Sequence, residues 1–445
     1  MNVLKSRIKL FLHKNPYYRH VLILTSGTAF SQLLLVLTSP LLTRLYTPED
    51  FGLLSVYISI VEIFVLLSSL HYEYALPLAK DEIGAANLLV LCFGILLSVC
   101  LFAALGFWFT HSFLFSFLKV PGLEKYFRLF PMSLLGMGSL KIVHYRAMRT
   151  KNFVPIAKAK MRQSMGMIGI QVVTGLLGRG TSGLVWGDAL GRLGGGGKLA
   201  CDVVKGNWHV LKKNVSLLGI RQVAVRYKKF PLILTGSSLI KEFAVHLPVV
   251  LLTLAYGPQV VGLFMLVQRI TGLPLTLIGE SINDVFMAEA SSLMKDNPRK
   301  ISKLYWDTLK HLFFLAVPFF LIVAFIAPWA FMFVFGQQWT AAGAYLRILT
   351  PMYLLQFVSI PVSATLLVFE RQKLQFLRDC IRFFLLSVVL IVVLTMALPE
   401  RTALILISIA GSLSFIIYGI ISWLAMTQYQ KALKKKDSKP DINVT

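Results

Sequence analysis

Long apolar stretches recur along this sequence of 445 residues, and they restrict what kind of protein it can be. A helix that crosses the hydrocarbon core of a bilayer needs about 20 mostly apolar residues. Of all residues, 56% are hydrophobic and 15% are charged, against about 45–50% and 25% in soluble globular proteins. We therefore predict an all-α polytopic membrane protein with about 12 transmembrane helices, and we exclude a soluble enzyme. The predicted spans are residues 21–42, 53–78, 86–109, 127–147, 159–178, 181–200, 231–255, 259–286, 311–335, 342–369, 376–398 and 403–427.

The basic residues alternate across the predicted loops. The chain has 45 Lys and Arg against 20 Asp and Glu, a net charge of +25. Lys and Arg are held on the cytoplasmic side of membrane proteins. With the N-terminus inside, 35 of the 45 fall in predicted cytoplasmic segments and the adjoining ends of the spans. This pattern predicts a multi-pass protein with both termini in the cytoplasm, and it explains the positive charge without nucleic-acid binding.

Two short patterns each occur twice, in the same order. Tyr46-Thr-Pro48-Glu-Asp-Phe-Gly52 recurs as Tyr256-Gly-Pro258-Gln-Val-Val-Gly262, and residues 126–135 resemble residues 345–355. Because each half then holds an even number of spans, we expect two parallel-related six-helix lobes around a central cavity. The predicted division is a cytoplasmic amphipathic tail (1–20), an N-lobe (21–200), a cytoplasmic interfacial linker (201–230), a C-lobe (231–428) and a basic cytoplasmic tail (429–445).

The motifs at these turns also resemble a known family. Ala29-Phe-Ser31-Gln32, the segment from Pro40 to Gly52 and the turn Phe335-Gly336-Gln-Gln-Trp339 are similar to Wzx-type O-antigen and polysaccharide flippases of the MOP (MATE-like) superfamily. The resemblance implies two lobes that open alternately to either side of the bacterial cytoplasmic (inner) membrane. It implies transport of an undecaprenyl-pyrophosphate-linked oligosaccharide, a unit of O-antigen, capsule or exopolysaccharide. Implied partners are this lipid-linked substrate and membrane lipids, with a polysaccharide polymerase or another biosynthetic membrane protein as a further candidate.

A pyrophosphate that crosses hydrocarbon needs a cationic route, because one charge at the bilayer centre costs from about 3 to over 10 kcal/mol. Cations within or at the ends of spans are therefore the candidates for binding pyrophosphate or glycan. These are Arg269, Lys141, Arg44 and Lys241. For Arg44, a place at the membrane interface is an equal alternative.

Four carboxylates are candidates for ion coupling or for a polar cavity: Glu62, Glu73, Glu242 and Asp188. Eleven residues make about three helical turns, so Glu62 and Glu73 are expected on nearly one face of the second span. The alternative is that these carboxylates pair with Lys141 or Arg44 and hold helices together.

The sequence has no pattern typical of catalysis. Residues 191–199 resemble a phosphate-binding loop, but Arg192 stands where a glycine is needed and Leu199 replaces the Ser or Thr that binds magnesium. We expect no catalytic residues, metal or cofactor. Two other functions stay open: a MATE-like cation-coupled drug exporter, and a membrane glycan polymerase or glycosyltransferase.

Overall fold

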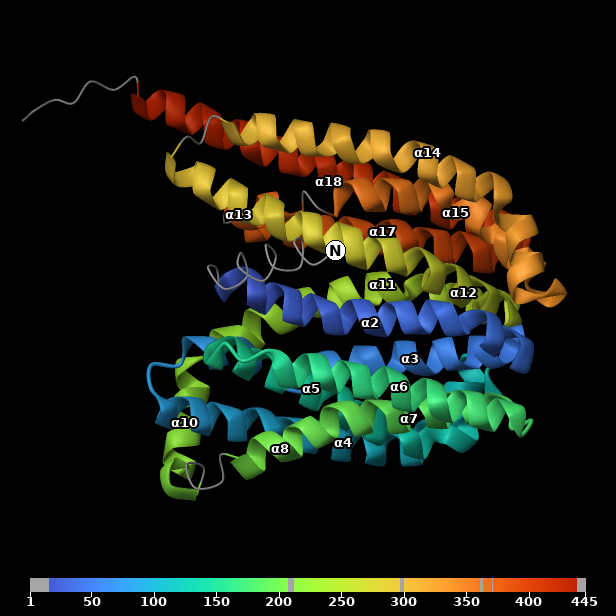
Figure 1. The fold of residues 1–445 in the computed structure, drawn as a ribbon, viewed down its shortest axis with the longest axis horizontal. Coiled ribbons are helices and arrows are strands. Elements are labelled where there is room, and N and C mark those ends of the chain that lie inside the picture. The colour runs from blue at the N-terminus through green and yellow to red at the C-terminus, as the bar shows by residue number, and fades with distance from the viewer. Residues whose placement is uncertain (1–15, 207–211, 297–299, 361–362, 370, 438–445) are drawn as a thin grey trace, which may run out of the picture. The chain divides into compact units, whose positions relative to one another are not determined.

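The computed structural model describes residues 16–206, 212–296, 300–360, 363–369 and 371–437, and within them it contains helices and no strands (Figure 1). Nine of these helical segments are long and apolar enough to cross a membrane. The predicted all-α polytopic membrane protein is therefore confirmed. Helices also occupy the other three predicted spans, 127–147, 159–178 and 181–200, but they are more polar than the nine.

The helices up to residue 256 include the predicted spans 1 to 7. They are α2 (Pro16–Leu45), α3 (Pro48–Leu67), η1 (Tyr72–Leu78), α4 (Glu82–Phe117), η2 (Pro121–Leu129), α5 (Phe130–Thr150), α6 (Val154–Leu176), α7 (Thr181–Arg192), η3 (Leu193–Gly197), α8 (Lys198–Gly206), α10 (Leu217–Arg226), η4 (Phe230–Leu234) and α11 (Thr235–Tyr256). The later ones are α12 (Pro258–Pro274), η5 (Leu275–Gly279), α13 (Glu280–Asp296), α14 (Ile301–Phe335), η7 (Gln337–Trp339), α15 (Thr340–Ser359), α16 (Ala364–Val368), α17 (Gln372–Met396) and α18 (Glu400–Asp437).

The chain forms two compact units, Met1–Met265 and Leu266–Thr445, which divide inside α12. The sequence instead predicts a division at residues 201–230. The difference arises because α11 packs against α3 in the first unit. The predicted bounds of the lobes, linker and tails stay a prediction, and residues 1–15 and 438–445 of the tails lie outside the described residues.

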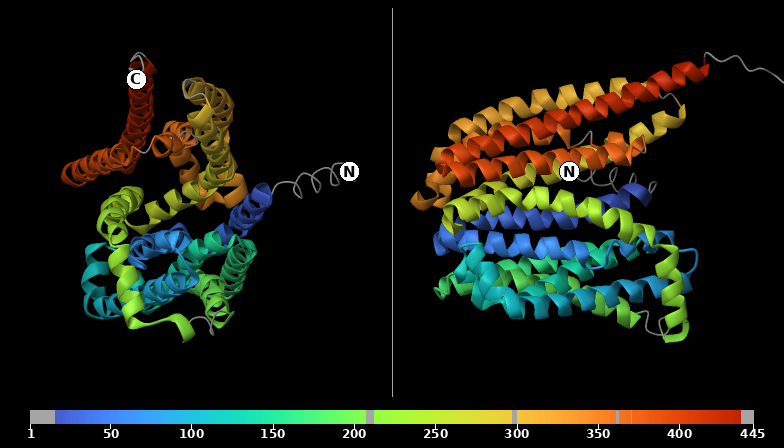
Figure 2. Two further views of the ribbon diagram at one scale, coloured as in Figure 1. Left: turned by 90° about the vertical axis from the view of Figure 1, so that its left-hand side faces the viewer. Right: turned by 180° about the vertical axis from the view of Figure 1, so that it is seen from behind.

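Within the first unit, long helices pack side by side. α6 packs against both α2 and α7, and α4 packs against α5. The short helix α10 contacts α4 and lies across the ends of the long helices rather than along them (Figures 1 and 2). In the second unit, α15 packs against α14 and α18, and α17 packs against α18 (Figure 2).

The first copy of the repeated turn starts α3. Thr47 is the N-cap: its hydroxyl accepts from the backbone N–H of Asp50, and the Asp50 carboxylate accepts from the backbone N–H of Thr47. Pro48 follows at the first helical position, where a missing N–H costs nothing. Tyr46 anchors the turn, because its buried hydroxyl donates to the carbonyl oxygen of Gln171 over 2.6 Å. The pattern therefore codes for a sharp boundary between two helices.

The two copies of the turn pack on each other through their glycines. A Cβ added to Gly52 would overlap the carbonyl oxygen of Pro258, and one added to Gly262 would overlap the carbonyl oxygen of Pro48. The contact is reciprocal, since the glycine of each copy faces the proline of the other. Glycine at both positions thus allows the first turns of α3 and α12 to approach at backbone distance.

The second predicted span is not one helix. α3 ends at Leu67, the backbone of Leu70 and His71 has φ of 46° and 62°, and η1 begins at Tyr72. The expectation that Glu62 and Glu73 share a helical face is therefore wrong, because a left-handed turn separates them. The imidazole of His71 lies 3.1 Å from the hydroxyl of Thr235, a contact that ties this turn to α11.

The glycine run at residues 194–197 lies in the π-helical segment η3, between α7 and α8. A Cβ at Gly196 would overlap the carbonyl oxygen of Gly136 on α5, and one at Gly195 would lie 2.8 Å from the carbonyl oxygen of Ala159 on α6. The run thus lets three helices pack closely, which explains a feature that resembles a phosphate-binding loop in the sequence.

Replacing Gly196 by alanine is expected to lower the free energy of unfolding by about 2 kcal/mol, because the added methyl group forces α5 and η3 apart. Gly194→Ala is the matched control, since nothing lies within 4 Å of a Cβ there. Thermal unfolding of both purified variants in one detergent measures the difference. Equal losses of stability would contradict this explanation of the glycine run.

Candidate functional site

Lys141 and Glu73 form a buried ion pair in the first unit. The Nζ of Lys141 on α5 lies 2.8 Å from Oε1 of Glu73 in η1, and the side chain of Glu73 is 0% exposed. The hydroxyl of Ser69 donates to the other carboxylate oxygen over 2.6 Å. A carboxylate so far from water needs such partners, because an unpaired buried charge is strongly unfavourable. The structure thus fits the alternative in which Lys141 holds helices together.

Glu62, Glu242 and His246 form a second cluster. The Nε2 of His246 on α11 lies 3.3 Å from Oε2 of Glu62 on α3 and 3.8 Å from Oε2 of Glu242, one turn earlier on α11. His246 is buried, whereas both carboxylates are partly exposed. The structure thus brings one imidazole and two carboxylates together across α3 and α11.

Asp188 pairs with Arg192, one turn later on α7. The Nε of Arg192 donates to Oδ2 of Asp188 over 2.6 Å, and both side chains are buried. The spacing of four residues is the one at which side chains meet on a helix. Both residues lie in the predicted sixth span, and their spacing was the signal in the sequence that could have predicted this pair.

The structure does not bring the other cations into these clusters. Arg44 is exposed in the last turn of α2, and Lys241 is exposed on α11. Arg269 is partly buried on α12, in the second unit. Among the ion pairs of the described residues, that of Lys141 with Glu73 joins a predicted cation to a predicted carboxylate.

A polar pocket that the sequence analysis missed lies between α2 and α6. It has a volume of about 200 Å³ and is lined by Ser31, Gln32 and Lys160 among others. The Nζ of Lys160 donates to the hydroxyl of Thr28 over 2.8 Å. Ser31 and Gln32, polar residues inside the predicted first span, were the signal for this pocket, and Lys160 lies at the start of the predicted span 159–178.

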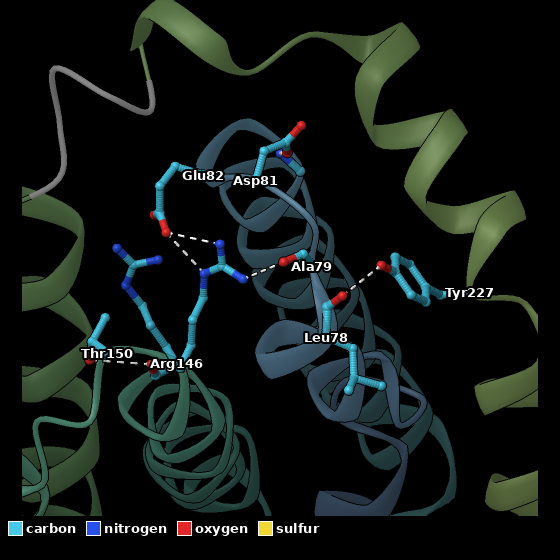
Figure 3. Close-up of polar contacts among 9 residues, drawn as sticks. Leu78, Ala79, Asp81, Glu82, Arg146, Thr150 and Tyr227 are labelled. Atoms are coloured by element: carbon cyan, nitrogen blue, oxygen red, sulfur yellow. Dashed lines mark hydrogen bonds and ion pairs between the residues drawn. The ribbon is translucent and has the colours of Figure 1, made fainter.

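The predicted cytoplasmic connection between η1 and α4 is held by side chains from the end of α5 and from the turn after α10 (Figure 3). The Nε of Arg149 at the end of α5 donates to Oε1 of Glu82 over 3.0 Å, and its Nη1 donates to the carbonyl oxygen of Ala79 over 2.5 Å. From the other side, the hydroxyl of Tyr227 donates to the carbonyl oxygen of Leu78 over 3.3 Å (Figure 3). The contacts of Arg149 join the start of α4 to the end of α5, and the contact of Tyr227 joins the end of η1 to the turn after α10.

The described residues contain no group of three His, Cys, Asp or Glu side chains arranged to hold a metal ion. The clusters instead consist of paired charges inside an apolar helical protein. Such pairs suit helix packing and reversible protonation.

The helices define the class as an all-α polytopic membrane protein, and its fold is similar to that of solved transporters of the MOP superfamily. An inward-facing multidrug resistance MATE family transporter of that superfamily aligns with a TM-score of 0.71 at 17% identity, over 91% of this chain and 96% of that one. Lipid II flippase MurJ in an inward closed conformation aligns with a TM-score of 0.66 at 14% identity, over 93% and 99% of the two chains. A MOP superfamily transporter from Pyrococcus furiosus, described as having a binding pocket of reverse polarity, aligns with a TM-score of 0.56 at 14% identity, over 92% and 95%.

The chain belongs to the family of polysaccharide biosynthesis proteins, whose sequence model matches residues 41–344. No curated protein matches the chain significantly. The resemblance to MOP-superfamily flippases that the sequence motifs predict is thereby confirmed at the level of family and fold.

Proposed function

We propose that this protein is a flippase that moves undecaprenyl-pyrophosphate-linked oligosaccharide across the bacterial cytoplasmic membrane by alternating access. One observation carries the proposal: a family of polysaccharide biosynthesis proteins is combined here with a fold that is also found in a lipid II flippase. Sugar units assembled on a lipid carrier inside the cell must cross the membrane before they are used outside. A membrane protein with a transporter fold suits this step.

Among the predicted cations, Arg269 is our candidate for contact with the pyrophosphate. A guanidinium can bind a phosphate through two parallel hydrogen bonds, whereas an ammonium binds as a point charge. Lys141 is already next to Glu73, and Arg44 and Lys241 are exposed. Lys141 is a weaker candidate because its pairing with Glu73 accounts for it, and Arg44 because it lies in the last turn of α2. Lys241 is weaker because its side chain is exposed, whereas Arg269 is partly buried.

We assign ion coupling to Glu62 and Glu242, with His246 as their proton-accepting neighbour. Their carboxylate oxygens lie 3.3 and 3.8 Å from the imidazole, and Asp, Glu and His side chains grouped within membrane spans are typical of proton relays in transporters. Glu73 and Asp188 have close cationic partners and fit a structural role better.

A deletion strain tests the proposal. We expect lipid-linked oligosaccharide to accumulate on the inner leaflet, wild-type protein to remove it, and Arg269→Ala to restore less than about a tenth of the transport, because losing a charge-assisted contact costs at least one factor of ten. Arg371→Ala, at an exposed arginine that is not among the candidates, is the matched control.

Two results would contradict the proposal in different ways. Full complementation by Arg269→Ala would remove this arginine from the mechanism. A deletion strain that accumulates no oligosaccharide but becomes sensitive to cationic drugs would favour the exporter instead.

A further inference from the structure

A second and larger pocket lies at the start of α6, apart from the clusters described above. It has a volume of about 730 Å³, and its lining comes from α6, α8 and the residues just before α6. Pockets that hold small ligands usually measure about 300–1,000 Å³. The pocket is therefore large enough for a lipid head group and the first part of its chains.

Two cations line this pocket without an ion pair among the described residues. Lys158 and Arg162 are four residues apart on α6, so they lie on the same side of the helix. Within the described part of the chain, the Nε of Arg162 is buried and has no hydrogen-bond acceptor. A buried donor of this kind costs free energy until an acceptor arrives. One carboxylate, Asp202 on α8, also lines the pocket and is exposed.

The remaining lining is largely apolar, and it continues along the exposed side of α6. Met165 in the lining is 58% exposed, and Val173 and Leu176 further along the helix are 57% and 69% exposed. These positions recur at nearly helical spacing and form one strip of the surface. In a membrane-spanning helix, an exposed apolar strip faces lipid chains. Lys158 and Arg162 lie at one end of this strip. The distribution of Lys and Arg along the sequence predicts that this end is on the cytoplasmic side.

We propose that the pocket binds the phosphate of an anionic phospholipid from the inner leaflet. The phosphate would accept hydrogen bonds from Arg162 and Lys158, and one acyl chain would lie along Met165 and Val173. A free phosphate ion would satisfy the cations but would gain nothing from the apolar strip. The site binds a structural or regulatory lipid, so it does not depend on which substrate the protein transports.

Native mass spectrometry of the full-length protein in detergent tests this site. Phosphatidylglycerol is the probe, phosphatidylcholine with the same chains is the comparator, and the dissociation constant of the tightest bound lipid is the readout. We expect phosphatidylglycerol to bind more tightly than phosphatidylcholine. Arg162→Gln should weaken phosphatidylglycerol binding about tenfold, the usual effect of losing one charge-assisted hydrogen bond.

Two further variants make the test specific to this pocket. Asp202→Asn removes the one carboxylate among the described lining residues, so it should tighten phosphatidylglycerol binding and leave phosphatidylcholine binding unchanged. Lys198→Gln is the matched control. It removes an exposed positive charge from α8, the helix that carries Asp202, at a position outside the pocket lining. Asp202 is exposed, so its variant keeps the test valid even where Arg162→Gln fails to fold.

Three results would overturn the proposal. The first is unchanged phosphatidylglycerol binding in a folded Arg162→Gln variant, and the second is weaker binding in Asp202→Asn. The third is displacement of the lipid by millimolar inorganic phosphate, which would make the pocket a site for free phosphate.

Discussion

Replacing Gly52 by alanine is expected to lower the free energy of unfolding by about 3 kcal/mol and to abolish transport, and Gly262→Ala is expected to do the same. At either position the new methyl group would overlap a backbone carbonyl oxygen, of Pro258 or of Pro48. A backbone atom cannot move aside as a flexible side chain can, so the first turns of α3 and α12 must separate. Thermal unfolding in detergent and complementation of the deletion strain measure the two effects.

Gly94→Ala on α4 is the matched control for both variants. Nothing lies within 4 Å of a Cβ at Gly94, and alanine favours a helix over glycine by about 1 kcal/mol. Its stability should therefore be unchanged or slightly higher. Because the contact is reciprocal, the double variant should lose much less than the sum of the two single losses. Additive losses would show that the two turns do not share one contact.

The helices could be predicted from the sequence because the bilayer sets their length. Runs of about 20 apolar residues mark the spans, and the motif from Tyr46 to Gly52 marks a boundary between helices by its proline and capping residues. The end of α3 at Leu67 could not be predicted in this way. Residues 68–71 contain no proline or glycine, so no local sequence signal predicts the left-handed turn at Leu70 and His71. The contact of His71 with Thr235 joins residues far apart in the sequence, and the spacing of apolar residues along the chain cannot predict such a contact.

The candidate site was predictable in its residue types and less so in its pairings. Charges within apolar runs are costly, so the sequence singles out Lys141, Glu73 and Asp188. Asp188 and Arg192 could have been paired from their spacing alone. Lys141 and Glu73 are 68 residues apart, and only packing brings α5 next to η1. The same limit applies to the two repeated turns, whose similarity was visible in the sequence although their contact was not.

Replacing Lys141 by methionine is expected to lower the free energy of unfolding by about 3–5 kcal/mol, since it leaves the carboxylate of Glu73 buried with Ser69 as its hydrogen-bond donor. The double variant Lys141→Met/Glu73→Gln should recover most of this loss, because neither side chain then carries a charge. Lys241→Met, at an exposed lysine of α11, is the matched control and should unfold like the wild type. Denaturation in one detergent measures all of these stabilities.

Transport by the double variant separates the two roles of Lys141 that the sequence leaves open. A purely structural pair predicts a double variant that is both stable and active in the complementation assay. A lysine that also binds the anionic substrate predicts a double variant that is stable but inactive, because methionine cannot bind a phosphate. A Lys141→Met single variant as stable as the wild type would contradict the buried ion pair itself, since removing one partner of such a pair leaves an uncompensated charge.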